Sequence, residues 1–378
     1  MISSPELLEL LIANGVDLIS GVPCSTLGNL ISLAAESSFL RYVPAANEGD
    51  AVAIAAGAWL AGGSGCAVMQ NSGLGNAVSP LTSLLHPFAI PARLCIGWRG
   101  KPGSTDEPQH VLMGGITRKV LELCGVETVL LSSISDHCVS DRLLAATLAI
   151  LVDSPLAGES RLEPLASCRS YPASIDDVRE GGLRPLRRRI LQELLATNSG
   201  DEAILSTTGR CSRELFDIED RPEHFYQAGS MGCVSSIGLG FALRNEASTI
   251  VIDGDGAALM RLGAMATIGA MSPNNLVHLL IDNEQHETTG GQPTVSNIVD
   301  LSRVASASGY ATAGICDSVD GFRILLNKTL AAAGPHFIVV KVKPGTSPTL
   351  GRPTLLPRDV ARRFRERFSG TRRSDPRQ

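Results

Sequence analysis

The stretch VIDGDGAALM holds one charge between two glycines, at Gly254-Asp255-Gly256, directly after an apolar run that is typical of a buried strand. A second apolar run, VHLLIDN, ends at Asn283. Because the carboxyl ends of parallel strands meet at one edge of a sheet, we expect Asp255 and Asn283 to lie close together there. A carboxylate and an amide oxygen, completed by diphosphate oxygens and water, suit the octahedral oxygen shell of Mg²⁺.

The two glycines give this edge a second property, because a backbone without side chains lets a phosphate group approach closely. The helix expected from about Ala257 offers free N–H groups and a favourable dipole to the same anion. An ordinary turn at Asp255 and a helix cap at Asn283 would also explain the pattern. The second element strengthens the prediction of a diphosphate and Mg²⁺ site, and the two interpretations stay open at this point.

The composition indicates a globular enzyme with large buried cores. The chain has 378 residues, of which 44% are hydrophobic and 19% charged, so we expect two domains. The net charge of −5 and the pI near 5.8 argue against a nucleic acid partner. No stretch resembles a signal peptide or reaches the length of a membrane helix. The nine cysteines form no CxxC pair and are expected to be reduced residues of a cytoplasmic protein.

Strand-like and helix-like patterns alternate along the chain, which predicts an α/β fold with two doubly wound parallel-sheet domains. At the N-terminus, Ser4 is expected to cap a helix that Gly15 ends. The alternation weakens in a stretch rich in proline, serine and glycine, which predicts a linker. We therefore expect a first domain at residues 1–160, a linker at 161–183, a second domain at 184–365 and a disordered tail at 366–378.

Stretches in both halves resemble one enzyme family, namely GVPCSTLGNLI, NEGDAVAIAAGAWLAGG, MQNSGLGNAVSPL, GWRGKPGSTDEPQH, STTGRCSRELF, GSMGCVSSIGLG and DNEQHETTGGQPT. The chain is similar to the thiamine diphosphate-dependent 2-oxo acid decarboxylases, and within them to the phosphonopyruvate decarboxylases, with the sulfopyruvate decarboxylases as close relatives. A GDG triplet followed at this distance by an asparagine is their thiamine diphosphate fingerprint. The resemblance implies two domains of the thiamine diphosphate-binding fold, pyrimidine-binding first and diphosphate-binding second, with thiamine diphosphate and Mg²⁺ as cofactors.

The resemblance also implies roles for the residues around the cofactor. Glu48 would hydrogen-bond N1′ of the aminopyrimidine and promote the tautomer whose N4′ takes the proton from the thiazolium. Met231 would support the bent shape of the cofactor. Beside Asp255 and Asn283, the backbone carbonyl of Gln285 would be the third protein ligand to Mg²⁺. Further residues expected around the diphosphate are Thr208, Gly209, Gly229, Ser230, Gly254 and Gly256.

The substrate needs cations or N–H groups that hold a tetrahedral anion. Ser25 and Thr26 lie at an expected strand–helix junction, which suits an oxyanion. Arg99 would grip a phosphonate with two hydrogen bonds, and Lys101 would act as a point charge. Lys101 departs from the acidic residue that is common at this place in the family.

Two histidines are candidates for a proton relay. His110 resembles the active-site histidine of related decarboxylases, and His286 is the second candidate. Each predicted residue also has a plainer interpretation. Glu48 suits a first helical turn, Met231 suits core packing, and the histidines and cations suit positions at or near the surface.

The implied activity is decarboxylation of 3-phosphonopyruvate to phosphonoacetaldehyde and CO2 in phosphonate biosynthesis. The implied assembly is a homo-oligomer, with the cofactor between the first domain of one subunit and the second domain of another. Neither nucleic acid nor a membrane is expected as a partner. The alternatives are a sulfopyruvate decarboxylase, which forms sulfoacetaldehyde, and a thiamine diphosphate-binding subunit without turnover. A nicotinamide dehydrogenase is a weaker alternative, because neither GLGNAV nor GLGFAL completes a GxGxxG fingerprint.

Overall fold

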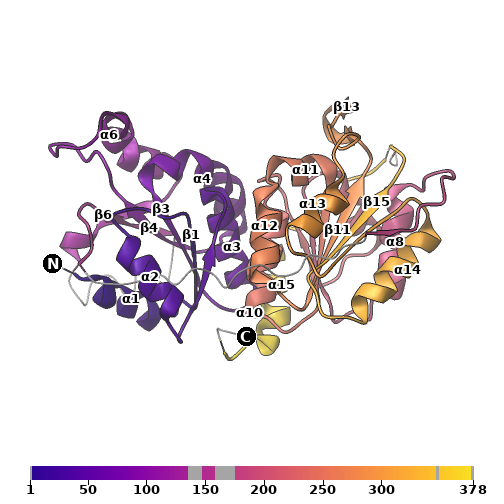
Figure 1. Ribbon diagram of the computed structural model, residues 1–378, viewed down its shortest axis with the longest axis horizontal. Helices are drawn as coiled ribbons and strands as arrows, with labels where there is room; N and C mark the ends of the chain where they lie inside the picture. Colours follow the sequence, from indigo (N-terminus) through magenta and orange to yellow (C-terminus); the bar gives the residue numbers. More distant parts are fainter. Residues whose placement is uncertain (1, 135–146, 158–174, 346–348, 376–378) are drawn as a thin grey trace.

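Two parallel sheets flanked by helices make up the computed structural model (Figure 1), which describes residues 2–134, 147–157, 175–345 and 349–375. Within these residues the first sheet has six strands in the order β2-β1-β3-β4-β6-β5, and all of its paired strands run parallel. The strands are β1 (Leu18–Gly21), β2 (Arg41–Pro44), β3 (Gly65–Gln70), β4 (Arg93–Gly97), β5 (Glu127–Leu130) and β6 (Leu148–Val152).

The helices of the first domain connect these strands. They are α1 (Ser4–Ala13), α2 (Gly28–Glu36), α3 (Glu48–Leu60), α4 (Leu74–Pro80), α5 (His86–Phe88) and α6 (Pro108–Leu123). The first helix begins one residue earlier than predicted. Its N-cap is Ser3, whose side chain accepts a hydrogen bond from the Glu6 N–H while the Glu6 carboxylate accepts one from the Ser3 N–H. This reciprocal capping leaves Ser4 inside the helix.

The second sheet repeats the topology of the first. Its described strands follow the order β7-β14-β15-β11-β10-β8-β9, so apart from β7 at one edge they connect in the same sequence as the strands of the first sheet. The strands are β7 (Asp176–Asp177), β8 (Ala203–Ser206), β9 (His224–Tyr226), β10 (Thr249–Gly254), β11 (Leu276–Asp282), β14 (Thr312–Cys316) and β15 (His336–Lys341). A short antiparallel hairpin pairs β12 (Gln285–His286) with β13 (Gln292–Pro293). The predicted two-domain α/β fold with doubly wound parallel sheets is confirmed.

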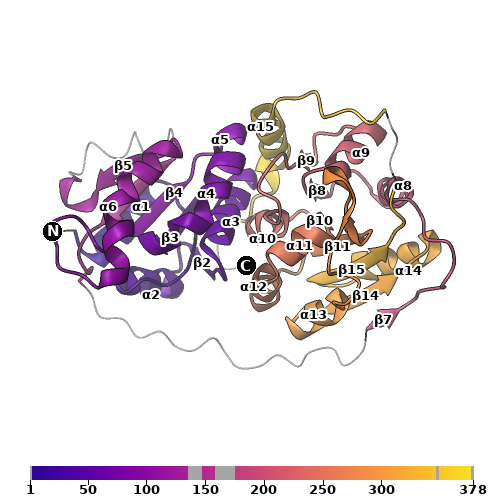
Figure 2. The same cartoon turned by 90° about the horizontal axis from the view of Figure 1, so that it is seen from above.

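Figure 2 shows the helices of the second domain around its sheet, with α10 and α12 on the side that faces the first domain. The helices are α8 (Arg187–Thr197), α9 (Arg210–Ile218), α10 (Val234–Arg244), α11 (Asp255–Met260), α12 (Gly263–Met271), α13 (Leu301–Ala307), α14 (Val319–Leu330) and α15 (Pro357–Phe368). In the described part of the chain, no helix combines the length and apolar character that crossing a membrane requires. The seven cysteines in that part are buried free thiols.

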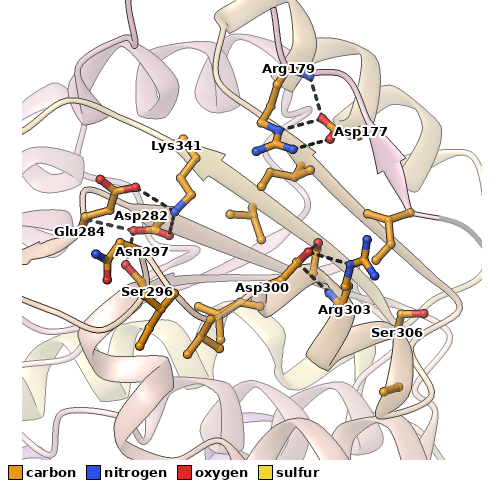
Figure 3. Close-up of a pocket in the computed structure, with 18 of the residues that line it drawn as sticks. Asp177, Arg179, Asp282, Glu284, Ser296, Asn297, Asp300, Arg303, Ser306 and Lys341 are labelled. Atoms are coloured by element: carbon orange, nitrogen blue, oxygen red, sulfur yellow. Dashed lines mark hydrogen bonds and ion pairs between the residues drawn. The ribbon is translucent and has the colours of Figure 1, made fainter. Parts of the chain in front are cut away.

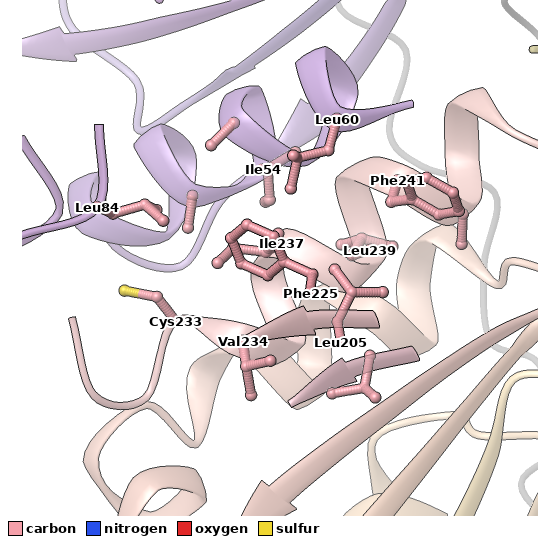
Figure 4. Packing of buried hydrophobic residues seen from close by; sticks show 14 of the residues in the cluster. Ile54, Leu60, Leu84, Leu205, Phe225, Cys233, Val234, Ile237, Leu239 and Phe241 are labelled. Atoms are coloured by element: carbon pink, nitrogen blue, oxygen red, sulfur yellow. The ribbon is translucent and has the colours of Figure 1, made fainter. Parts of the chain in front are cut away.

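The two domains meet where α3 crosses α10. A Cβ on Gly57 would lie 2.0 Å from the carbonyl oxygen of Ile237, and a Cβ on Gly240 would lie 2.0 Å from that of Ile54. Only glycine therefore allows the two helices this backbone contact. Apolar side chains of both domains surround the crossing and form one continuous core (Figure 4). The two sheets are thus held by a close-packed contact, which determines how the loops at their edges face each other.

The ends of the predicted domains differ from the structure in two places. Residues 366–375 do not form a free tail: α15 continues to the buried Phe368, and Arg372 forms an ion pair with Asp17 at 2.6 Å. The prediction failed because the arginines of this segment suggested solvation, whereas Asp17 of the first domain binds one of them. The predicted linker at 161–183 lies partly outside the described residues, but Asp176 and Asp177 pair with β14 as an edge strand.

We predict that Gly57→Ala separates α3 from α10. The added methyl group would have to displace backbone atoms, so the free energy of unfolding should fall by about 1–3 kcal/mol or more. Chemical denaturation would measure the change. Gly115→Ala is the matched control, because Gly115 is also inside a helix and its Cβ would have no heavy atom within 4 Å. Equal stability of the two variants would contradict the account.

Candidate active site

A cavity of about 270 Å³ opens at the carboxyl ends of β8, β10 and β11. β8 lies between β9 and β10, so the strand order reverses beside it, and open α/β sheets bind ligands at such a reversal. Nine of the residues predicted from the sequence line this cavity, namely Thr208, Gly209, Met231, Gly254, Asp255, Gly256, Asn283, Gln285 and His286. The structure thus brings together the GDG triplet and the asparagine that the sequence placed on neighbouring strands.

Hydroxyl groups hold the carboxylate of Asp255 on one side. Thr294 Oγ1 donates to Asp255 Oδ2 at 2.5 Å, and Ser296 Oγ lies 3.3 Å from the same oxygen. Ser296 Oγ also donates to Asp282 Oδ1 at 2.8 Å. Asp255 is only 3% exposed, and its burial raises the pKa of its carboxyl group, an effect that the Thr294 hydroxyl opposes and the charge of Asp282 reinforces.

Ion pairs continue this network away from the cavity. Lys341 Nζ lies 2.7 Å from Asp282 Oδ2 and 3.1 Å from Glu284 Oε1. Figure 3 shows these groups on the wall of a second, larger hollow of about 890 Å³. Each cation on that wall is bound to a carboxylate, in the pairs Arg179–Asp177, Arg184–Glu284, Arg303–Asp300 and Lys341–Asp282. This hollow therefore offers an anion no cation that is free of a carboxylate partner. What it contributes to the first cavity is Lys341, which pairs with Asp282.

The glycines of the triplet have different surroundings. A Cβ on Gly256 would lie 2.4 Å from Cε1 of His286, so the His286 ring packs directly on the backbone there. A Cβ on Gly254 would meet no heavy atom within 4 Å, so this backbone is open to the cavity. At Gly209 the backbone has a φ of 94°, which favours glycine, directly before α9. These features fit a cradle in which a diphosphate contacts backbone atoms.

Two predicted cofactor residues lie beside the cavity rather than on its wall. Ser230 Oγ is 2.7 Å from Ser83 Oγ of the first domain, and the Ser230 N–H donates to the same oxygen at 2.9 Å. A Cβ on Gly229 would lie 2.8 Å from Ser83. Gly229 and Ser230 therefore join the two domains and fix the start of the loop that carries Met231.

Glu48 is the first residue of α3, directly after the N-cap Asn47. Its Oε2 accepts a hydrogen bond from Asn76 Nδ2 at 2.8 Å, and it does not line the cavity. Arg261 of the second domain donates to Asn47 Oδ1 at 2.7 Å and to Asp50 Oδ1 at 3.1 Å. The residues on both sides of Glu48 are thus tied to the segment that follows α11.

The predicted substrate residues of the first domain gather at the carboxyl edge of the first sheet. Arg99 donates from Nε and Nη2 to Asp106 and from Nη1 to Ser25 Oγ at 3.1 Å. The guanidinium group holds the pKa of Asp106 well below its usual range. Thr26 is buried and lies within 3.0 Å of the Cys24 sulfur. The structure thus joins Arg99 to Ser25 and reveals Asp106 as a partner that sequence reasoning missed.

Lys101 and His110 differ in their surroundings. Lys101 Nζ forms a 2.5 Å ion pair with Asp153 and lies 5.9 Å from the centre of the Trp98 ring. His110 lies in the first turn of α6, is 9% exposed, and its buried Nδ1 has no hydrogen-bond partner in the described structure. Neither residue lines the cavity at Asp255.

Comparisons with known proteins agree with this geometry. Residues 5–86 match the thiamine pyrophosphate enzyme, N-terminal TPP binding domain, and residues 207–340 match the C-terminal TPP binding domain. The chain belongs to the thiamine pyrophosphate enzymes.

Relatives cover nearly the whole chain. It is 45% identical to the phosphonopyruvate decarboxylase of Streptomyces viridochromogenes, over 97% of this chain and 94% of the relative. It is 30% identical to the sulfopyruvate decarboxylase of Methanosarcina acetivorans, over 96% of each. The crystal structure of benzoylformate decarboxylase from Polynucleobacter necessarius has the same fold, with a TM-score of 0.68 at 14% identity, covering 92% of this chain and 100% of that one.

The donor set fits the cofactors that this family implies. Asp255 and Asn283 offer hard oxygen ligands, and the open backbone at Gly254 leaves room for a diphosphate. Among the described residues no cluster of three histidine, cysteine or acidic side chains could bind a metal by itself. A metal in this cavity would therefore need amide, carbonyl and ligand oxygens besides Asp255, which is the ligand set that suits Mg²⁺.

Several residues of the site escaped sequence reasoning. Thr294 and Ser296 stand two positions apart in QPTVS, and Glu287 and Arg187 also border the cavity. The spacing of Thr294 and Ser296, two hydroxyl residues two positions apart, is the signal that the sequence offers for this contact.

We predict that Asp255→Asn stabilises the cofactor-free protein. Because burial raises the pKa of Asp255, keeping this group ionised lowers the free energy of unfolding at neutral pH. Removing the charge should raise the melting temperature by about 2–4 °C for each kcal/mol gained. The gain in melting temperature should be full at about pH 8. It should shrink as the pH falls through the raised pKa of Asp255 towards the ordinary aspartate value of about 3.9. At such a low pH the parent carboxyl is also neutral.

Differential scanning fluorimetry across this pH range would measure the effect. Asp201→Asn is the control, because Asp201 is a carboxylate at the surface, 87% exposed. A melting temperature that falls at neutral pH, or a gain that does not change with pH, would contradict the account of Asp255.

Proposed function

We propose that this protein is a thiamine diphosphate- and Mg²⁺-dependent decarboxylase that converts 3-phosphonopyruvate to phosphonoacetaldehyde and CO2. One observation carries the proposal: the cavity beside β8 unites Asp255, Asn283 and the open backbone of Gly254 in a chain that is 45% identical, over nearly its whole length, to a phosphonopyruvate decarboxylase. The match to a sulfopyruvate decarboxylase of similar length has 30% identity, which favours the phosphonate as substrate.

Asp255, Asn283 and the carbonyl of Gln285 would hold Mg²⁺, and Thr208 and Gly209 would contact the diphosphate. Met231 would support the cofactor from the loop that Ser230 fixes to Ser83. When bound, thiamine diphosphate supplies an electron sink for the electrons released as CO2 leaves. The protein residues bind and orient the reactants and move protons around this step.

Glu48 would exchange a proton with N1′ of the aminopyrimidine. Its neighbours Asn47 and Asp50 accept hydrogen bonds from Arg261, so the second domain of the same chain fixes the N-terminus of α3. Asn76 Nδ2 binds one carboxylate oxygen of Glu48 and would leave the other for the cofactor. Such proton transfer by a positioned side chain is worth about 10²–10⁴-fold in rate.

Arg99 and Ser25 would bind the phosphonate. Asp106 holds the guanidinium group in one orientation before the substrate arrives, which lowers the entropy lost on binding. A phosphonate carries up to two negative charges, whereas a sulfonate carries one. A cation at this place therefore binds the phosphonate more strongly. His110 and His286 remain the candidates for the proton relay, and the unpartnered buried Nδ1 of His110 supports the first.

We also propose a homo-oligomer with the cofactor at a subunit interface. The residues of the first domain that would contact the substrate, Ser25, Arg99 and His110, do not line the cavity of their own chain. A second copy could bring them to it. The buried free thiols suit a cytoplasmic protein, where disulfides are rare.

The test is a turnover assay with thiamine diphosphate and Mg²⁺ that offers phosphonopyruvate, sulfopyruvate and pyruvate separately and detects the aldehyde. We expect kcat/KM to be at least about tenfold higher for phosphonopyruvate than for sulfopyruvate, because the anion subsite distinguishes their charges. Chelation of the metal should abolish turnover. A preference for sulfopyruvate would contradict the assigned substrate, and absence of turnover on all three would contradict the decarboxylase function.

A further inference from the structure

We propose that Glu287 is a positioning residue, which orients the amide of Asn283 so that its oxygen faces the metal site, and that Arg187 holds Glu287 in place. The inference rests on the proposed function, because it assigns Asn283 as a metal ligand. Glu287 and Arg187 both border the cavity that contains Asp255 and Asn283. Neither needs to touch the metal or the cofactor for this role.

The contact between Asn283 and Glu287 selects one orientation of the amide. Asn283 Nδ2 donates to Glu287 Oε2 at 3.2 Å, while Asn283 Oδ1 accepts a longer hydrogen bond from the Gln285 N–H at 3.3 Å. An ionised carboxylate can only accept hydrogen bonds, so it binds the nitrogen end of the amide and repels the oxygen end. Because Asn283 is buried, a flipped amide would direct its oxygen at the Glu287 carboxylate and its NH2 group at the Gln285 N–H, which costs free energy.

Arg187 fixes the carboxylate that makes this selection. Its Nη1 donates to Glu287 Oε2 at 2.9 Å, while its Nε and Nη2 each donate to Glu214 at 3.0 Å. The Gly345 N–H donates to the other oxygen of Glu287 at 2.9 Å. Arg187 and Glu214 are almost fully buried, so the paired charges cannot move apart without large cost. The Glu287 carboxylate is thus held at both oxygens by groups outside the metal site.

The same arrangement explains why Arg187 borders an anion site without serving as its cation. Three of its nitrogens donate to carboxylates, so its charge is balanced by Glu214 and Glu287 before any ligand binds. Outer hydrogen bonds of this kind typically change metal affinity about 10–100-fold when they are removed. The geometry therefore predicts an effect on metal binding that is separable from stability.

The test is Mn²⁺ binding in the presence of saturating thiamine diphosphate, with free Mn²⁺ measured by electron paramagnetic resonance. We expect Glu287→Gln to raise the Mn²⁺ Kd about 10–100-fold, because the amide it introduces no longer selects one end of the Asn283 amide. Glu219→Gln is the matched control: the carboxylate of Glu219 pairs with Arg221 away from the cavity, and the Kd should stay within about threefold of the parent.

A double variant separates positioning from a general structural role. If Glu287 acts through the amide of Asn283, Glu287→Gln should raise the Mn²⁺ Kd in the parent but change it less than about threefold in the Asn283→Ala background. A structural role independent of that amide would raise the Kd by the same factor in both backgrounds. A Kd for Glu287→Gln within about threefold of the parent, or an equal rise in both backgrounds, would overturn the inference.

The outcome also distinguishes this inference from the proposed function. Asp255→Asn should weaken Mn²⁺ binding, since it changes a proposed ligand. If Asp255→Asn weakens Mn²⁺ binding and Glu287→Gln does not, the result supports the proposed metal site and contradicts the proposed role of Glu287. If the parent does not bind Mn²⁺ at all, the proposed metal site and this inference are both wrong.

Discussion

The backbone contact between α3 and α10 is the constraint on which the rest of the structure depends. Gly57 and Gly240 allow it, and no larger residue could stand at either place without moving a helix. The contact joins two sheets of the same topology, so that Glu48, at the start of α3, and Met231, just before α10, belong to one rigid unit. A site between subunits, which needs the first domain of one chain and the second domain of another, gains precision when each chain is rigid.

The cavity contains a buried charge, the Asp255 carboxylate, whose burial is unfavourable. Asp255 is buried and forms no ion pair with another described residue; two hydroxyls contact its carboxylate. Of the nearby cations, Lys341 is paired with Asp282, and Arg187 with Glu214 and Glu287. Arg210 also lines the cavity, and its buried Nε has no hydrogen-bond partner in the described structure. A divalent cation bound at Asp255 would neutralise this buried charge. Such a departure from stable packing is expected where a protein binds a metal.

The sequence predicted which residues lie at this site, but not the hydrogen bonds that hold them in place. Asp255 and Asn283 could be located because each follows an apolar strand, and strand ends in a parallel sheet converge by geometry. Thr294, Ser296 and Glu287 could not, because their hydrogen bonds join segments whose contact depends on how the loop after β11 folds back.

The errors have a similar cause. The arginine-rich C-terminal segment suggested a solvated tail, but Asp17, far away in the sequence, binds Arg372. Ser230 stays a predicted cofactor residue, and its contact with Ser83 of the other domain could not be predicted from its motif. Local patterns predict which elements form, while partners supplied by the tertiary fold decide what a polar side chain does.

The most direct test of the account is a crystal structure with thiamine diphosphate and Mn²⁺, in which anomalous scattering locates the metal. The account predicts Mn²⁺ in the cavity beside β8, bound by Asp255 and Asn283, with the diphosphate against Gly254. Mn²⁺ bound elsewhere, or a cofactor placed without contact to Asp255 and Asn283, would contradict it.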